Sequence, residues 1–362
     1  MQRLGDYIDQ IRGVSYKPAD VRDENAGIAI LRANNIQDKV DLSDLVYVDE
    51  NKVSDVQFLK KGDVLICASS GSKNLVGKAV LIPNDMNASF GAFCKVVRIK
   101  QISQVNSDFI RMFFLSKNYR NAIAECSIGA NINNIKSDHL NGLGINIPNY
   151  DIQCSAVDYL TKLKQAIDLK RKQLEDLDEL VKSKFQEMFG DPVENEKELP
   201  TKRFIDVVKM QRGFDLPVHS RDEKGEIPVY GSNGILGYHS ESKIDCGVIT
   251  GRSGTIGEVY YCDTPFWPLN TTLFSVDRHG NNVVYLRYLL EFFDLKRFAS
   301  GVGVPTLNRN DFHEIQIIDV PHTEQEEFAL FVRKTEKAKV LLKQEISDLE
   351  ELMDSKMDEY FG

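Results

Sequence analysis

The chain has 362 residues, of which 42% are hydrophobic and 27% charged, and its formal net charge is −9. This length exceeds what one compact core usually holds, so two or more domains are expected. The composition is that of an ordinary soluble globular protein, and no apolar run approaches the ~18 residues that a membrane span needs.

The N-terminus and the cysteines indicate a reducing cytoplasm. No apolar segment follows Arg3, so a signal peptide is not expected. The six cysteines are scattered and form no CxxC pair, which argues against both a disulfide scaffold and a zinc site.

The negative charge is unevenly distributed. Residues 1–150 and 200–320 carry net charges of +2 and −2, whereas 151–199 and 321–362 carry −4 and −5. An acidic chain is a poor partner for nucleic acid. Because the acid is concentrated in the second and fourth segments, the first and third can still present local basic faces.

Residues 1–150 predict an α+β domain. Short β-rich runs broken by Gly and Ser fill 60–100, and a short helix is expected near 107–124. The segment Gly71–Lys78 resembles a phosphate-binding P-loop. The spacing of its glycines is one position too long, and Ala79 stands where Ser or Thr should bind magnesium, so a nucleotide site is not predicted.

Two polar loops of this domain are candidates for DNA contact. Exposed loops offer side chains and backbone N–H groups to DNA, and Asn makes bidentate contacts to adenine edges. Tight turns and polar capping connections are the alternative interpretation, and both stay open. The candidate residues are Ser72, Lys73, Asn74, Asn133, Asn134 and Lys136.

A long helix is predicted over about 152–189. Its apolar residues follow a heptad seam, and Gly190 with Asp191-Pro192 ends it. The seam residues are Leu160, Leu163, Ile167, Leu174, Leu177 and Val181.

Residues 191–320 predict a second α+β domain, with β-rich runs over 227–276 and a helix near 282–298. The stretch Gly251–Gly257 lies between two strand-like runs, as Gly71–Lys78 does, and it is not a GxGxxG motif. Arg and Asn here suit guanine and adenine edges. The candidate residues for DNA contact are Tyr230, Asn233, Arg252, Ser253, Thr255, Asn308 and Arg309.

A second long helix is predicted over about 323–361, beginning with the capping-box pattern Thr323–Glu326. Each long helix has roughly 38 residues, about 57 Å at ~1.5 Å per residue, and cannot bury its stripe alone. We expect the two helices to pair within the chain as an antiparallel coiled coil; pairing with another subunit's helix is the alternative. The seam residues of this helix include Leu342, Ile346, Leu349 and Met353.

An internal repeat organises the chain. The segment Leu177–Lys184 matches Leu349–Lys356, and both copies end in aromatic-rich segments closed by glycine. Near the starts of the domains, Arg12-Gly13 parallels Arg212-Gly213, which lie farther apart than the matched helix segments do. The first copy therefore has additional residues in its middle. The predicted organisation is a domain (1–150), a helix (151–190), a domain (191–320) and a helix (321–362).

No catalytic constellation is found. The six histidines are isolated and form no HExxH pair, and there is no GxSxG motif. The Pro-Pro-Tyr or Pro-Pro-Phe segment with which amino-methyltransferases hold a target base is also missing from the sequence. We therefore predict no catalytic residue, no metal site and no cofactor bound by this chain.

The domain–helix–domain–helix plan resembles the DNA-specificity subunit of type I restriction–modification systems. The most specific likeness is in the helix ends Ser183–Gly190 and Ser355–Gly362, and in the segments Ile145–Pro148 and Ile315–Pro321 that close the domains. The likeness covers essentially the whole chain. It implies a fold of two pseudo-repeated α+β target-recognition domains separated by two long helices that pair as an antiparallel coiled coil.

The resemblance also implies a function. Each recognition domain would read one half of a split asymmetric site in double-stranded DNA. The helices would act as a ruler and as the docking surface for two methyltransferase subunits, and motor-nuclease subunits would complete the restriction complex. S-adenosylmethionine, ATP and magnesium would be bound by those partners, in the cytoplasm of a prokaryote.

Two alternatives stay open. The chain could be the recognition subunit of a fused restriction–methylation enzyme with the same plan, or a scaffold whose domains bind proteins instead of DNA. Because base-reading residues vary within the resembled family, no contact residue carries over from it.

Overall fold

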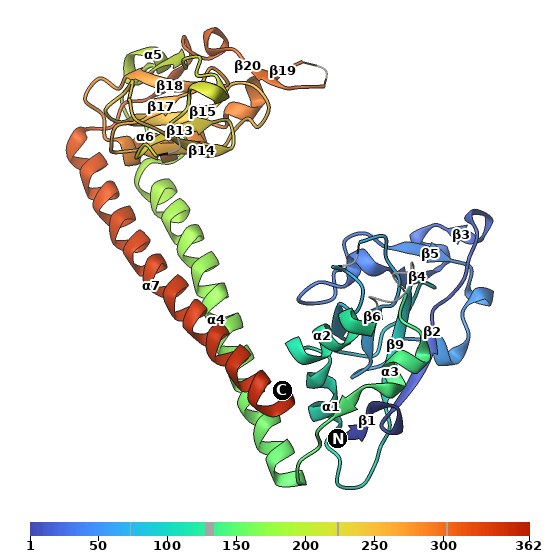
Figure 1. Cartoon of the computed structure of the whole chain (residues 1–362). Helices are drawn as coiled ribbons and strands as arrows, with labels where there is room; N and C mark the ends of the chain where they lie inside the picture. Colours follow the sequence, from blue (N-terminus) through green and yellow to red (C-terminus); the bar gives the residue numbers. More distant parts are fainter. Residues whose placement is uncertain (73, 127–133, 223, 302) are drawn as a thin grey trace. The chain divides into compact units, whose positions relative to one another are not determined.

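The computed structural model describes residues 1–72, 74–126, 134–222, 224–301 and 303–362. They form two compact units. The first unit is Met1–Lys170 together with Glu345–Gly362, and the second is Arg171–Gln344. Each unit holds one α+β domain and a part of each long helix (Figure 1).

The first domain is built on two four-stranded sheets. One is antiparallel, in the order β2 (Ile8–Arg12), β9 (Cys94–Ile99), β6 (Val64–Cys67) and β7 (Ala79–Leu81). The other has the order β3 (Val21–Arg22), β5 (Val46–Val48), β4 (Ile28–Leu31) and β8 (Ala88–Phe90), with β4 and β8 parallel. A third, two-stranded sheet joins β1 (Gln2–Arg3) to β10 (Gly144–Ile145).

The helices of the first domain cover the antiparallel sheet. They are α1 (Ser107–Phe113), α2 (Lys117–Cys126) and α3 (Ser137–Gly142). Strand β6 is buried at all four positions, as its unbroken apolar run requires. The 3-10 helices in the loops are η1 (Leu4–Asp6), η2 (Pro18–Asp20), η3 (Glu24–Ala26), η4 (Ala33–Asn35), η5 (Glu50–Lys52) and η6 (Asp55–Gln57).

The second domain repeats this plan. Its antiparallel sheet has the order β12 (Lys209–Arg212), β18 (Thr272–Asp277), β15 (Gly247–Gly251) and β16 (Val259–Cys262). Its second sheet has the order β14 (Gly234–His239), β13 (Ile227–Gly231) and β17 (Trp267–Pro268), with β13 and β17 parallel. The remaining elements are β11 (Thr201–Arg203), β19 (Ala299–Ser300), β20 (Thr306–Leu307), β21 (Gln316–Ile318), α5 (Phe204–Val207), α6 (Val283–Phe292), η7 (Val218–Ser220), η8 (Leu295–Phe298) and η9 (Arg309–Asp311).

The two copies of the repeat share even the close backbone contact of one glycine in each domain. A Cβ atom placed on Gly13 would lie 2.1 Å from the carbonyl oxygen of Gly91, and one placed on Gly213 would lie 2.2 Å from that of Leu269. Each glycine follows the first strand of its antiparallel sheet and lets that strand approach the turn before the second strand. The predicted α+β class with two pseudo-repeated domains is therefore confirmed.

The two long helices, α4 (Tyr150–Phe189) and α7 (His322–Phe361), have 40 residues each. In the first unit, Lys170 pairs with Glu345 at 2.6 Å, and the Lys356 ammonium lies 5.9 Å from the centre of the Tyr159 ring.

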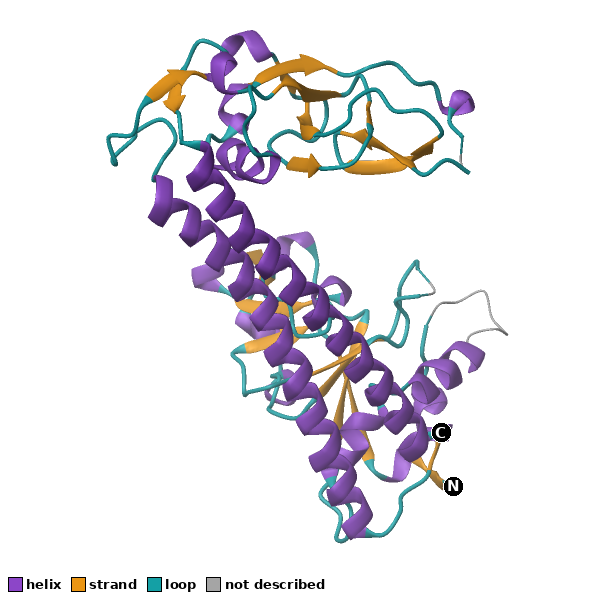
Figure 2. Cartoon of the chain, turned by 90° about the vertical axis from the view of Figure 1, so that its left-hand side faces the viewer, coloured by secondary structure: helices purple, strands orange, loops and turns teal. Residues whose placement is uncertain are grey.

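In the second unit, Lys339 forms an ion pair with Asp178, and the rings of Phe189 and Phe328 lie 5.7 Å apart. In both units, the later a residue lies in α4, the earlier its contact lies in α7. This order confirms antiparallel pairing within the chain, which Figure 2 shows as two purple helices side by side.

The predicted seam residues line this pairing to different depths. Some of them are buried, whereas others keep one side open to solvent because two helices alone cannot enclose a seam. Buried are Leu160, Leu163, Ile167, Val181 and Ile346; half-buried are Leu174, Leu177, Leu342, Leu349 and Met353. Phe185, outside the predicted set, is fully buried and stacks on Phe292 of α6 at 4.6 Å.

The cysteines are free thiols. Cys67 and Cys94 face each other across β6 and β9, and burial raises the pKa of Cys94 to about 12, so that its thiol stays protonated and unreactive. Within the described parts of the chain, no helix has the length and hydropathy to cross a membrane, and no group of His, Cys, Asp and Glu side chains is arranged to hold a metal ion.

Candidate nucleic-acid interface

The two candidate loops of the second domain lie against each other. The backbone N–H of Leu307 donates to the carbonyl oxygen of Arg252 at 2.8 Å, and that of Gly254 donates to Pro305 at 3.1 Å. Ser253 and Thr306 form an isolated β-bridge. Two segments far apart in the sequence therefore make one continuous surface.

The candidate loops of the first domain meet in the same way. Ser69 and Asn134 form an isolated β-bridge, and the N–H of Ile135 donates to the carbonyl oxygen of Ala68 at 2.7 Å. Asn134 corresponds to Thr306 in the alignment of the two copies that matches the long helices. The candidates Lys73 and Asn133 lie outside the described residues.

In each domain a third segment is hydrogen-bonded to this surface. It is the turn before β9 in the first domain and the turn before β18 in the second. In the first domain the N–H groups of Ala68 and Ser69 both donate to the carbonyl oxygen of Phe93, at 2.9 Å each. In the second domain the N–H groups of Arg252 and Ser253 donate to that of Thr271, at 2.8 and 3.2 Å. Phe93 and Thr271 are thus structurally equivalent.

A fourth segment follows β4 or β13. The N–H of Gly91 donates to Leu31, and the N–H of Leu269 donates to Tyr230, each at 2.9 Å. Asn34 and Asn233 each lie three residues after the acceptor of this bond, so they occupy equivalent positions in the two domains. The two domains therefore share one backbone framework of four segments, on which the side chains differ.

Glycine shapes the second-domain loop. A Cβ atom on Gly251 would lie 1.7 Å from the carbonyl oxygen of Thr255, and Gly254 has a φ angle of +92°. The loop is therefore a tight turn, and the same turn leaves the Thr255 side chain exposed. The two interpretations of this stretch, a tight turn and an exposed polar loop, are compatible.

The other candidates differ in exposure. Seven are exposed, and Arg252, Ser253 and Arg309 are half-buried. The exposed residues are Ser72, Asn74, Asn134, Lys136, Asn233, Thr255 and Asn308.

Tyr230 is placed differently from the sequence-based expectation of a loop that faces DNA. Its side chain is only 8% exposed and packs with Ile249, Phe266 and Phe274. Burial raises the pKa of its hydroxyl. Tyr230 belongs to β13, whose side chains alternate between faces, and this one faces the core. Asn233 is the exposed residue of that turn.

Some candidates also have structural contacts. The Asn308 side chain accepts a hydrogen bond from the N–H of Asn310 at 3.1 Å and so caps η9. The carbonyl oxygen of Asn74 accepts from Arg120 of α2 at 2.8 Å, which holds this loop against the helix. The capping interpretation therefore applies to Asn308, while Asn74 keeps its side chain exposed.

In the first domain, residues 32–34, 69–71 and 91–94 of this framework, together with residues 14–16, line a groove of about 710 Å³. Sequence reasoning missed most of its lining. One signal was present, since Asn34 and Asn233 follow corresponding strand-like runs in the two copies, but an exposed aromatic residue in a turn such as Phe93 gives no comparable sign. The groove is lined by Val14, Ser15, Tyr16, Arg32, Ala33, Asn34, Ser69, Ser70, Gly71, Gly91, Ala92, Phe93 and Cys94.

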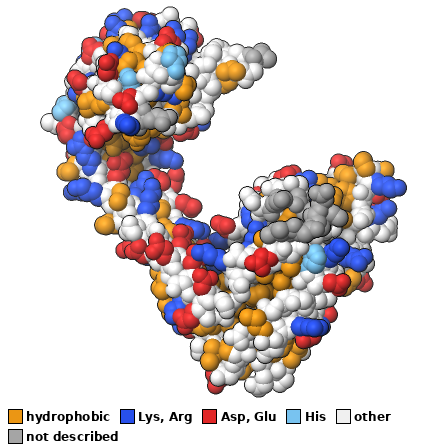
Figure 3. All heavy atoms as spheres, viewed as in Figure 1, with side chains coloured by type: hydrophobic (Ala, Val, Ile, Leu, Met, Phe, Trp, Pro, Cys, Tyr) orange, Lys and Arg blue, Asp and Glu red, His pale blue; other side chains and the backbone are white. Residues whose placement is uncertain are grey.

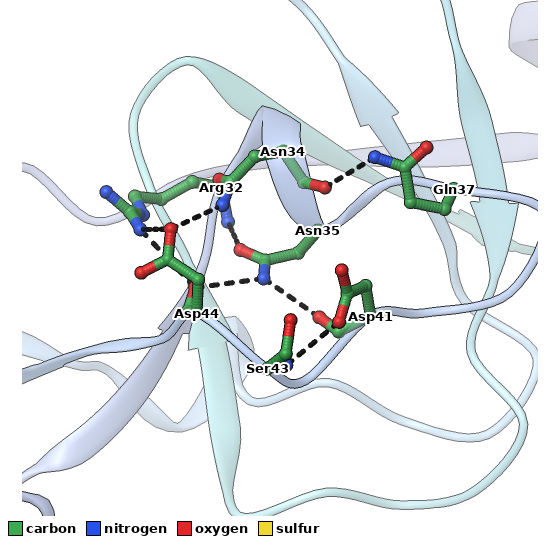
Figure 4. A network of polar contacts seen from close by, with 7 residues as sticks. All are labelled: Arg32, Asn34, Asn35, Gln37, Asp41, Ser43 and Asp44. Carbon is green, nitrogen blue, oxygen red and sulfur yellow. Dashed lines mark hydrogen bonds and ion pairs between the residues drawn. The ribbon is translucent and has the colours of Figure 1, made fainter. Parts of the chain in front are cut away.

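Residues 32–34, at the start of the loop from Arg32 to Asp44, line this groove, and a buried amide holds the loop in shape (Figure 4). The Asn35 side chain accepts from the N–H of Arg32 at 2.7 Å and donates to the carbonyl oxygens of Asp41 and Asp44 at 2.8 and 3.0 Å. Hydrogen bonds from Ser43 lower the pKa of the Asp41 carboxyl, which therefore stays charged. The loop is an ordered structure that presents polar side chains.

The chemistry of these surfaces suits binding. The side chains are hydrogen-bond donors and acceptors of the kinds that contact bases and phosphates. The buried histidine His313 accepts a hydrogen bond from the N–H of Met210 at 3.3 Å, and burial and Arg309 lower its pKa. It is a neutral core residue.

The family model and the relatives that match this chain all belong to type I restriction systems. A family model described as the type I restriction modification DNA specificity domain matches residues 2–179 and again residues 196–351. The chain is 36% identical over 287 residues to the type I restriction enzyme EcoKI specificity subunit of Escherichia coli (strain K12), covering 77% of this chain and 59% of that protein.

It is also 37% identical over 175 residues to the type I restriction enzyme StySPI specificity subunit of Salmonella potsdam, covering 48% of this chain and 37% of that protein. The chain thus matches less than two thirds of the length of either relative.

Solved structures share the fold. The S subunit of a type I restriction–modification system from M. genitalium matches with a TM-score of 0.58 at 16% identity, covering 100% of this chain and 95% of that one. A structure that concerns complex assembly and conformational transition of the type I R-M system matches with a TM-score of 0.60 at 13% identity, covering 98% of this chain and 97% of that one.

Proposed function

We propose a function from the premise that this chain belongs to the family of type I restriction–modification DNA specificity proteins, which the sequence motifs predict and the family match confirms. The chain would be the sequence-specific DNA-binding subunit that directs methyltransferase and restriction subunits to a split asymmetric site. It would act in the cytoplasm of a prokaryotic cell and catalyse no reaction itself.

The observation that carries this proposal is the repeated four-segment framework. Equivalent backbone hydrogen bonds hold equivalent loops in both domains, while the side chains on those loops differ, as the exposed Phe93 and the half-buried Thr271 do. Two similar surfaces with different side chains suit two half-sites of different sequence.

The long helices suit a ruler. Forty residues of α-helix span about 60 Å, which lies between one and two turns of DNA at ~34–36 Å per turn. Bases between the half-sites would go unread, and the length of the helices would set their number.

Repeated exposed leucines on the helices suit two copies of one protein partner. Leu169 and Leu341 are 59% and 66% exposed, and Leu180 and Leu352 are 48% and 37% exposed. The members of each pair occupy matching positions in the two copies of the repeat. We infer that these positions contact two methyltransferase subunits, because exposed leucines on a helix gain most from burial against a partner.

The charges on the helices also suit protein partners. Along α4 and α7, the face drawn in Figure 3 mixes Asp and Glu with Lys and Arg and shows no continuous basic surface. Such a surface suits a protein partner better than a phosphate backbone. Motor-nuclease subunits would join the methyltransferase complex, and these partners would bind S-adenosylmethionine, ATP and magnesium.

The test is to map methylated motifs in DNA from cells that express the chain with the methyltransferase encoded beside it. We expect one split asymmetric motif that vanishes when this gene is deleted. The purified chain alone should bind DNA weakly, with a steep salt dependence, and should neither methylate nor cleave it. Catalysis by the isolated chain would refute the non-enzymatic assignment.

Purification of the chain with its partners also distinguishes the two alternatives, a fused restriction–methylation enzyme and a protein-binding scaffold. A single co-purified polypeptide with both restriction and methylation activity would identify a fused enzyme as the partner. Salt-independent association with proteins and no DNA binding would favour the scaffold.

A further inference from the structure

We propose that Arg32 and Asn34 are the residues with which the first domain distinguishes bases in its half-site, and that Asp44 positions both. The assignment rests on the proposed function, and it concerns the groove of the first domain and the loop shown in Figure 4.

Arg32 has hydrogen-bonding capacity to spare. Its Nη2 donates to the carboxylate of Asp44 at 2.8 Å and to the Asp44 carbonyl oxygen at 3.3 Å. Its Nη1 donates to no described residue, and its side chain, 36% exposed, lines the groove. Because Nε is buried, a half-exposed guanidinium fixed in this way can offer the N–H groups of Nη1 to the O6 and N7 atoms of guanine.

Asn34 shares the same anchor. Its Nδ2 donates to the same oxygen of Asp44 at 2.8 Å, and its backbone carbonyl accepts from Gln37 at 2.8 Å. Its side chain is exposed and lines the groove beside Arg32. Asp44 therefore holds two residues of the types that read guanine and adenine, side by side on one loop.

The loop is preorganised. Asn35, between the two proposed readers and Asp44, is fully buried and makes three hydrogen bonds that close the loop. Lys78, at the end of the neighbouring loop, donates to the Gln37 side chain at 2.7 Å and ties the two loops together. A reader held in this way loses little conformational entropy on binding.

Asp44 favours base reading over phosphate binding. Its carboxylate lies at hydrogen-bond distance from both readers, so a phosphate approaching them would meet a like charge. A guanine or adenine edge is neutral and meets no such repulsion. An arginine that served as a phosphate contact would be better placed without a carboxylate beside it.

The second domain shows that this device is specific to the first. There β13 and β14 are joined by the short turn Ser232-Asn233, whereas β4 and β5 are joined by the long loop 32–45. The position equivalent to Arg32 is Gly231, which has no side chain. The additional residues of the first copy thus supply a reading loop that the second domain lacks.

Phe93 completes the groove. It is 70% exposed on a turn whose backbone is fixed by two hydrogen bonds from Ala68 and Ser69. An exposed ring on a rigid turn beside polar readers suits an apolar contact with a thymine methyl group.

The test uses the complex with its methyltransferase and a library of 30-base-pair duplexes of random sequence. The enriched motif is compared for wild type, Arg32→Ala, Asp44→Asn and Arg22→Ala. Arg22 is a matched control because it forms the same kind of ion pair, with Asp49 at 2.8 Å, and is 38% exposed, but it does not line the groove.

We expect Arg32→Ala to lower discrimination about 5- to 150-fold at one position, which is guanine in the wild-type motif. The other half-site should be unchanged. Asp44→Asn should weaken discrimination to a smaller extent at the positions read by Arg32 and Asn34, with little change in the thermal midpoint of unfolding, and Arg22→Ala should leave the motif unchanged.

Two results would overturn the assignment while the proposed function stands. One is an unchanged motif for both Arg32→Ala and Asp44→Asn alongside a split wild-type motif. The other is a uniform loss of affinity for all sequences with a smaller salt slope, which would make Arg32 a phosphate contact. A wild-type complex that enriches no split motif would overturn the proposed function, and this assignment with it.

Discussion

The two α+β domains share one backbone framework and differ in the loops and side chains on it. Gly13 and Gly213 make the same close approach, and the same pairs of N–H and carbonyl groups fix the loops. On this common framework one domain carries the long loop 32–45 and an exposed Phe93, and the other carries a short turn and Thr271. Backbone bonds between distant segments allow the surface to change without disturbing the fold.

The largest effect is expected from shortening both helices. Deleting one heptad from each, 172–178 and 339–345, keeps the heptad register and shortens the pair by about 10 Å, or about three base pairs. We expect methylation of the original motif to vanish and a motif with the same half-sites and a shorter spacer to appear, measured by methylome sequencing.

Deletion from one helix alone is the control and should abolish both motifs, because the pairing loses its register. An unchanged spacer after the double deletion would show that the helices are not the ruler.

The next largest effect tests whether the helix ends are equivalent parts of the two cores. Phe361 packs on Phe109 with ring centres 4.7 Å apart, and its counterpart Phe189 packs on Tyr285 at 5.3 Å. Both phenylalanines are buried, so truncation to alanine should cost about 3–5 kcal/mol of unfolding free energy in each case.

The single tryptophan, Trp267, lies buried in the second domain and reports on that domain alone. In urea titrations followed by its fluorescence, Phe189→Ala should lower the midpoint and Phe361→Ala should not. Equal shifts for both variants would show that the two units unfold together.

A smaller effect is expected at the paired glycines. A methyl group on Gly213 would collide with a carbonyl oxygen 2.2 Å away, and overpacking of this kind costs about 1–3 kcal/mol. Gly213→Ala should lower the urea midpoint of Trp267 fluorescence, while Gly13→Ala should leave it unchanged and lower the unfolding midpoint of the first domain, measured by hydrogen exchange. Tolerance of both substitutions would contradict the proposed close approach.

The smallest effect is a pH dependence confined to the second domain. Burial lowers the pKa of His313, so the folded domain holds it neutral while the unfolded chain binds a proton below about pH 6.5. Stability from this group is complete above that pH and is lost as the pH falls toward the lowered pKa. The urea midpoint should therefore drop between pH 7.5 and pH 5.5.

The first domain supplies the control substitution. At the position equivalent to His313 it has Asn141, which accepts a hydrogen bond from Gln10 at 2.8 Å and does not titrate. His313→Asn should reduce the drop in the midpoint. A drop of the same size in the variant would assign the pH dependence to other groups.

The helices and the repeat can be predicted because both appear as patterns in the sequence itself. Heptad spacing identifies the seam, and the match of Leu177–Lys184 to Leu349–Lys356 identifies the second copy. The groove could not be predicted in this way, because it depends on hydrogen bonds between segments such as Leu31 and Gly91. The burial of Tyr230 was not predicted, because the polar residues that follow it suggested a loop, whereas Tyr230 lies in a strand and faces the core.

The packing of Phe361 on Phe109 has a consequence for biosynthesis. The second unit is one continuous stretch of sequence, whereas the first needs residues from both of its segments. The ribosome makes Phe361 roughly 250 residues after Phe109, a delay of about 10–50 s at ordinary rates of translation. During that interval the apolar face of α1 lacks its cover, so the first domain to be made is the second to be finished, and its apolar surface stays exposed for longer.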